Sequence, residues 1–216
     1  DAQESRGLGD VYKRQIQNNN TDPQGENLSL WGYFVRCITK KYSDFSGRAR
    51  RKEWWSYILF QLLIFIVPVV LFVATTVGEM MSDPDTIQYM SQNPDDEEYI
   101  YSLMSGNVYF WAMMIVGLLL LVPWLAVTCR RFHDVGISSG LFWVVGGLTI
   151  LSYVITLFVM IEPGVIPHAV TSIYNILSSL VGLVILVIAF IPGKVGPNVY
   201  GPDPKPAPTY EGYGQI

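Results

Sequence analysis

Acidic, basic and histidine side chains are absent from four long stretches of this chain of 216 residues. A helix needs about 20 apolar residues to cross the hydrocarbon core of a bilayer, whereas an uncharged run of about 10–14 residues is more typical of a buried soluble helix. None of the four stretches carries the polar stripe of a soluble amphipathic helix. We therefore predict an all-α membrane protein with four transmembrane helices. The predicted spans are residues 54–77, 107–129, 141–161 and 171–191.

The same absence bears on function. Ion-coupled transporters and proton relays place ionisable side chains inside their spans, and these spans have none. The few polar residues there favour helix packing. Ser178 and Gly182, spaced like a small-xxx-small pair, allow close helix approach. The sequence also leaves a homo-oligomer open.

Cysteine is also scarce, with only Cys37 and Cys129, so no disulfide framework is indicated. His133 and Asp134 lack a neighbouring His or Cys cluster that would complete a metal site. Neither a P-loop nor a dinucleotide-binding fingerprint occurs. We therefore expect no metal, no cofactor and no enzymatic activity, and we expect the bilayer rather than a nucleic acid as the partner.

Basic residues are missing from the connections between spans one and two and between spans three and four. All eleven Lys and Arg residues after Gln15 lie before span one, between spans two and three, or after span four. The segment 78–106 is acidic instead. Because basic loops stay in the cytoplasm, both termini are predicted to be cytoplasmic, which agrees with an even number of spans.

The two ends of the chain are predicted to lie outside the membrane domain, which covers residues 28–205. Residues 5–15, SRGLGDVYKRQ, match the in-frame translation of a transposase sequencing adapter. We therefore treat residues 1–15 as an artefact rather than native sequence. The polar segments 16–27 and 206–216 are predicted to be disordered.

An amphipathic helix is predicted before span one, in the segment SLWGYFVRCITKKYSDF. Trp31, Val35, Ile38 and Tyr42 recur at spacings of three and four residues and share one helical face. A helix with that aromatic face in the bilayer interface explains the pattern. A soluble helix packed on a partner is the alternative.

The segment RRFHDVGISSG follows span two directly. Gly136 can end the helix in a left-handed conformation, and Ser138 or Ser139 can cap the next helix. Residues 136–140 also match the G-x-S-x-G nucleophile elbow, but that motif requires a strand-to-helix turn and a downstream His. The downstream His168 is predicted on the opposite side of the membrane. A tight turn between two spans is therefore the preferred interpretation.

Three motifs together resemble a bacterial inner-membrane family, the domain of unknown function 805 family. They are DFSGRARRKEWW (44–55), RRFHDVGISSG (130–140) and GPNVYGPDPK (196–205). One departure is visible, since the family often has Ser-Gly-Trp after the turn and this chain has Ser139-Gly140-Leu141. The resemblance implies a four-span fold in the bacterial inner (plasma) membrane and implies no mechanism.

All three motifs fall at predicted cytoplasmic ends of spans, so we expect them to meet as one polar cap. In this cap Arg48 and Arg51 would face Asp134 and Asp203, with arginine donors left over for an anionic lipid headgroup or a protein partner. The predicted cap residues are Arg48, Arg51, Glu53, Arg130, Arg131, His133, Asp134, Gly136, Asn198, Tyr200, Gly201 and Asp203. The alternatives are a small-solute transporter or channel component, and a membrane enzyme that acts on a lipid headgroup through His133 and Asp134.

Overall fold

The computed structural model describes residues 28–94, 96–162 and 165–205, so the expectations for 1–15, 16–27 and 206–216 lie outside the described part. Four of its helices are long and apolar enough to cross a membrane, which confirms the predicted all-α fold with four spans. The described residues contain seven helices: α2 (Leu30–Ile38), α3 (Arg51–Ser82), α4 (Pro84–Gln92), α5 (Glu97–Gly106), α6 (Val108–Val135), α7 (Ser139–Ile161) and α8 (His168–Phe190).

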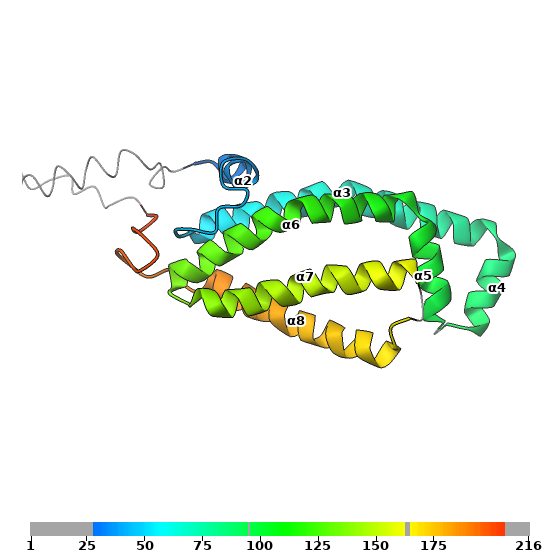
Figure 1. Cartoon of the computed structure of the whole chain (residues 1–216). Helices are drawn as coiled ribbons and strands as arrows, with labels where there is room; N and C mark the ends of the chain where they lie inside the picture. Colours follow the sequence, from blue (N-terminus) through cyan, green and yellow to red (C-terminus); the bar gives the residue numbers. More distant parts are fainter. Residues whose placement is uncertain (1–27, 95, 163–164, 206–216) are drawn as a thin grey trace, which may run out of the picture.

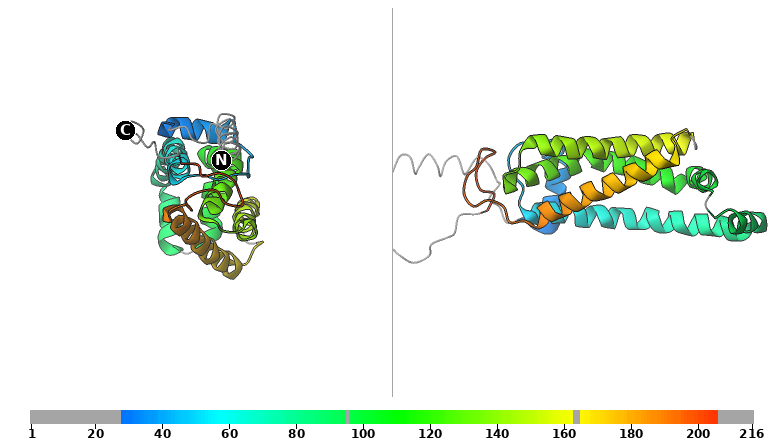
Figure 2. Two further views of the ribbon diagram at one scale, coloured as in Figure 1. Left: turned by 90° about the vertical axis from the view of Figure 1, so that its left-hand side faces the viewer. Right: turned by 90° about the horizontal axis from the view of Figure 1, so that it is seen from below.

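The four long helices form a bundle in which α3 and α6 run antiparallel and pack along most of their length (Figure 1). α7 turns back from the end of α6, and α8 returns beside α7. The short helix α2 lies across one end of the bundle, and α4 and α5 lie at the opposite end (Figure 2). We call these the α2 end and the far end. The α2 end also holds the start of α3, the turn between α6 and α7, and the segment after α8.

α6 is longer than the predicted span, because it continues through the Arg-Arg-x-His-Asp motif to Val135. The charges of this last part are buried and paired, so the helix does not have to end at its last apolar residue. Gly136 ends it with a φ of 84°, as expected for a left-handed C-terminal residue. Its N–H donates to the carbonyls of Phe132 and His133.

The acidic segment after span one is helical over most of its length. α3 extends to Ser82, and two further helices, α4 and α5, follow it. The side chains of Asp83 and Asp96 cap them by accepting from the N–H groups of Asp85 and Tyr99. Pro84 occupies the first turn of α4, where its missing N–H costs nothing. This Asp-Pro start signal is present in the sequence.

α2 is present, and the face that it buries against α3 is not the aromatic face predicted to lie in the bilayer interface. Tyr33, Phe34 and Cys37 are buried, whereas Trp31 is 58% exposed. The helix packs against the start of α3, and the Ser56 hydroxyl of α3 donates to the Leu30 carbonyl. Packing on α3 therefore buries the Tyr33 and Cys37 side of the helix, while Trp31 of the predicted interfacial face stays largely exposed and touches the Phe60 ring of α3.

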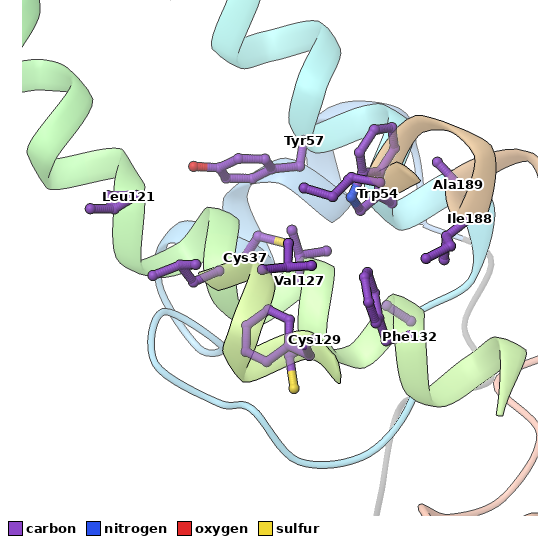
Figure 3. Close-up of a cluster of buried hydrophobic side chains, with 14 of the residues drawn as sticks. Cys37, Trp54, Tyr57, Leu121, Val127, Cys129, Phe132, Ile188 and Ala189 are labelled. Atoms are coloured by element: carbon purple, nitrogen blue, oxygen red, sulfur yellow. The ribbon is translucent and has the colours of Figure 1, made fainter. Parts of the chain in front are cut away.

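The hydrophobic core lies near the α2 end. A cluster that includes Trp54, Tyr57, Val127, Phe132 and Ile188 joins α3, α6 and α8 there (Figure 3). Along the rest of the spans many large apolar side chains are exposed. Examples with exposed fractions of 56% or more are Leu62, Val67, Ile115 and Leu180. These side chains suit contact with lipid, as expected for a bundle that crosses a bilayer.

Candidate functional site

Asp134 lies at the centre of the α2 end and accepts from two arginines. Its Oδ1 is 3.0 Å from Nε of Arg48, which precedes α3, and 2.9 Å from an Nη of the same side chain. Its Oδ2 is 2.5 Å from Nη1 of Arg131, one turn earlier on α6. The three side chains are almost completely buried. Burial of these charges is tolerated because each is paired and hydrogen-bonded.

Other guanidinium N–H groups of these arginines reach backbone carbonyls, while the buried Nε of Arg131 has no hydrogen-bond partner. Arg48 donates to the carbonyl of Gly196 at 2.6 Å and to that of Lys194, and Arg131 donates to the carbonyls of Ala49 and Ile191. The N–H of Lys194 also donates to the Asp134 carbonyl at 2.9 Å. The bonds of Arg48, Arg131 and Asp134 therefore connect the segment before α3, the end of α6 and the segment after α8.

A separate ion pair lies beside the cluster of Arg48, Arg131 and Asp134. Nη2 of Arg130 is 2.9 Å from Oε1 of Glu53 in the first turn of α3, and both side chains are buried. Nη1 of Arg130 donates to the Asp44 carbonyl. The Cys37 thiol of α2 lies 3.7 Å from Glu53 Oε1. Burial, and then the Glu53 charge, raise the pKa of Cys37 to about 12, so this thiol is an unreactive packing group.

His133 makes contacts with all three motifs. Its Nδ1 is 3.0 Å from the Gly47 carbonyl, and its Nε2 is 2.9 Å from the Ser139 hydroxyl. The ring of Tyr200 stacks on the imidazole with 3.9 Å between centroids and 3° between planes. The Asn198 amide donates to the His133 carbonyl at 2.9 Å.

The structure brings most of the predicted cap residues together, but Arg51 and Asp203 do not meet. Arg51 is exposed, and its Nη1 is 3.4 Å from the Phe190 carbonyl. The Asp203 carboxylate accepts from the N–H groups of Gly196 and Lys205 and so shapes a turn. Arg51 starts a helix on the outside of the bundle, which the spacing of the motif does not reveal.

Two glycines show how closely the segments approach. A Cβ atom added to Gly193 would lie 1.9 Å from Oδ2 of Asp134. A Cβ at Gly136 would meet the side chain of Lys194 at 2.4 Å. Gly193, Ser139, Asp44 and Cys37 were not among the predicted cap residues. Asp44 and Ser139 lie within the motifs named above, and Gly193 follows Pro192 in a Pro-Gly pair that marks a turn, whereas Cys37 carried no signal.

Charge is divided between the two ends of the bundle. Every Lys and Arg of the described residues lies at the α2 end (Figure 1). Arg48, Arg130 and Arg131 are buried and committed to internal partners. The exposed basic residues, which we call the basic rim, are Lys40, Arg51, Lys52, Lys194 and Lys205. The described acidic residues of the far end are Glu79, Asp83, Asp85, Asp96, Glu97, Glu98 and Glu162.

A groove of about 240 Å³ lies between α6, α7 and α8. Its lining residues are Trp124, Leu148, Thr149, Ser152, Ser178, Val181, Gly182 and Ile185. The Ser178 hydroxyl is buried without a hydrogen-bond partner. Among the described residues, no group of three or more His, Cys, Asp or Glu side chains is arranged to hold a metal ion.

The fold and the site define a four-span membrane protein with an arginine–carboxylate network at one end. Residues 42–202 match the profile of the family described as "Protein of unknown function (DUF805)". The chain belongs to this family, since the match covers well over half of its residues.

The chain is similar to the inner membrane protein YhaH of Escherichia coli strain K12, with 27% identity over 171 residues. The alignment covers 79% of this chain and 95% of that protein. YhaH of Escherichia coli O157:H7 matches with the same identity and coverage. No solved structure gives a significant match.

Proposed function

We propose that the protein is an inner-membrane protein with both termini in the cytoplasm, and that its basic rim binds anionic phospholipid headgroups. One observation carries the proposal: all Lys and Arg of the described residues lie at one end of the bundle, and the other end is acidic. Basic ends of membrane proteins stay cytoplasmic, and the cytoplasmic leaflet is rich in anionic lipid.

The buried and exposed basic residues have different roles in this proposal. Arg48, Arg130 and Arg131 hold the three segments in place and are buried away from a headgroup, including the unpaired Nε atoms of Arg130 and Arg131. The basic rim supplies the headgroup contacts, at about 1 kcal/mol for each Lys or Arg near an anionic surface. The exposed Trp31 of α2 suits the interfacial region, where tryptophan is enriched.

Thermal unfolding of the purified protein in neutral detergent, with added phosphatidylglycerol or phosphatidylcholine, tests the proposal. Phosphatidylglycerol should raise the melting temperature more than phosphatidylcholine. The triple variant Lys40→Gln/Lys52→Gln/Lys205→Gln should lose most of this difference. The matched variant with Arg at the same three positions should keep it because it keeps the charge. An equal lipid response in all three proteins would refute headgroup binding by the rim.

The alternatives gain less support from the geometry. Two hollows of about 240 Å³ and 540 Å³ are lined by residues of the described spans, and neither is lined by an ionisable side chain of the kind that ion-coupled transporters use. Asp134 is already engaged by two arginines and is poorly placed as an acid or base. A protein partner of the polar cap and a homo-oligomer stay predictions.

A further inference from the structure

The hydrogen bonds of His133 determine its tautomer. Nδ1 faces the backbone carbonyl of Gly47 at 3.0 Å, and a carbonyl can only accept, so Nδ1 carries the proton. In the neutral ring Nε2 is then an acceptor. Its partner at 2.9 Å is the Ser139 hydroxyl, which must donate. Cys129 Sγ lies farther away, 3.6 Å from Nε2. Ser139 therefore has the relation to His133 that a nucleophilic serine has to its base.

Ser139 also stands beside backbone donors. It is the first residue of α7, and Ser138 at the N-cap makes no side-chain capping hydrogen bond. The first N–H groups of a helix have no partners inside the helix. The space around Gly140 is open, since a Cβ atom there would meet only Ser138 Oγ, at 3.9 Å. A carbonyl oxygen brought to Ser139 could accept from the N–H of Gly140, as in an oxyanion hole.

We propose that Ser139 and His133 form a nucleophile–base pair that hydrolyses carboxylic esters of amphiphilic molecules. The Ser139 oxygen attacks the ester carbonyl carbon, and its proton passes to Nε2 of His133. The ester C–O bond then breaks, and the departing alcohol takes that proton. Water then attacks the acyl-serine and gives a proton to Nε2 of His133; the bond between the acyl carbon and the Ser139 oxygen breaks, Ser139 takes the proton back, and the carboxylic acid leaves. The Gly47 carbonyl and the stacked Tyr200 ring position the imidazole.

The surroundings of Ser139 indicate an amphiphilic substrate. Leu141 and Trp143 in the first turns of α7 are 46% and 56% exposed, and the site lies at the α2 end of the bundle, where α7 begins. An acyl chain can lie against these side chains while its ester reaches Ser139. This inference does not depend on lipid binding by the basic rim.

The pair departs from the expectation of a non-enzymatic protein. The nucleophile elbow G-x-S-x-G would use Ser138 and a downstream His. In the structure the contact joins Ser139 to the upstream His133, which the last turn of α6 places beside the start of α7.

Labelling with an alkyl fluorophosphonate, followed by peptide mass spectrometry, tests the proposal on the full-length protein in detergent. The probe should modify Ser139, and a long-chain probe should react faster than a short-chain one. Ser138→Ala should label like the parent, while His133→Gln should label about 100-fold more slowly or less. No modification of Ser139 in a protein that melts cooperatively would overturn the proposal, as would parental labelling of a folded His133→Gln. Equal rates for the two probes would overturn the substrate class.

A second measurement covers the case in which His133→Gln does not fold. Ser139→Cys and Ser138→Cys are made singly and treated with iodoacetamide near neutral pH. The native thiols Cys37 and Cys129 are buried and should stay silent. Activation by His133 should make Ser139→Cys react with iodoacetamide at least tenfold faster than Ser138→Cys. If the more exposed Ser138→Cys reacts as fast or faster, the base does not activate position 139 and the proposal fails.

Discussion

At the scale of single residues, the buried ion pairs explain why arginine rather than lysine occupies the motif positions. The Arg48 guanidinium binds a carboxylate and two carbonyls at the same time, which the compact ammonium of lysine cannot reproduce. The sequence predicted that Arg48 and Asp134 would meet. It gave no indication of the carbonyl acceptors or of the pairing between Arg130 and Glu53, because these depend on how three separate segments dock.

Replacing Asp134 by Asn should destabilise the protein strongly. The change leaves two buried guanidinium groups without a counter-charge, and removing one partner of a buried ion pair costs about 3–5 kcal/mol. Thermal unfolding in detergent should therefore show a clearly lower melting temperature. Asp203→Asn is the control, since this less buried carboxylate accepts only from backbone N–H groups. Equal effects of the two changes would argue against a central role for Asp134.

Gly193→Ala should also be destabilising, because the added Cβ would lie 1.9 Å from Asp134 Oδ2 and the segment after α8 would have to move. Gly182 offers a matched control, since a Cβ there would meet nothing within 4 Å. Gly182→Ala should be neutral or stabilising by up to about 1 kcal/mol through helix propensity. The measurement is the difference in melting temperature between the two variants. A tolerated Gly193→Ala would contradict the close approach.

At the scale of elements, composition located the four spans and periodicity located α2, but neither predicted the short helices α4 and α5. A run of more than 20 uncharged residues can pair its backbone groups in a bilayer by forming a transmembrane helix, so the α3, α6, α7 and α8 spans follow from the sequence. The buried face of α2 depends on which surface of α3 it meets. The helical end of α6 depends on ion pairs formed with residues far away in the chain.

Docking of α2 should control the reactivity of Cys37. In the folded protein this thiol is buried and its pKa is raised to about 12, so maleimide should not modify it near neutral pH. Phe34→Ala removes a buried aromatic ring from the contact with α3 and should expose the thiol. Leu30→Ala, at a partly exposed position of the same helix, should leave Cys37 protected. Equal modification of Cys37 in both variants would contradict the docked position of α2.

At the scale of the whole molecule, the division of charge predicts a direction in the membrane. Arg48, Arg130 and Arg131 have a structural role and also contribute to the positive end, so under this prediction one set of residues serves both folding and orientation. The acidic helices α4 and α5 face the other way. The capped starts of α4 and α5 indicate that the segment between the first two spans forms a defined structure.

Cysteine labelling in intact cells should reveal this direction, with both termini in the cytoplasm. Single cysteines at Ser91 and Val165 report on the far end, and those at Lys40 and Val195 report on the α2 end; all four positions are exposed. A membrane-impermeant maleimide that enters the periplasm should modify Ser91→Cys and Val165→Cys only. Lys40→Cys and Val195→Cys should react only after the cells are permeabilised. Because basic residues resist translocation, adding Lys residues to α4 should weaken the preference for this orientation. Cysteines at both ends should then be modified in part of the molecules. Modification of Val195→Cys in intact cells would mean that the α2 end faces outward, and binding of its basic rim to the cytoplasmic leaflet would then be excluded.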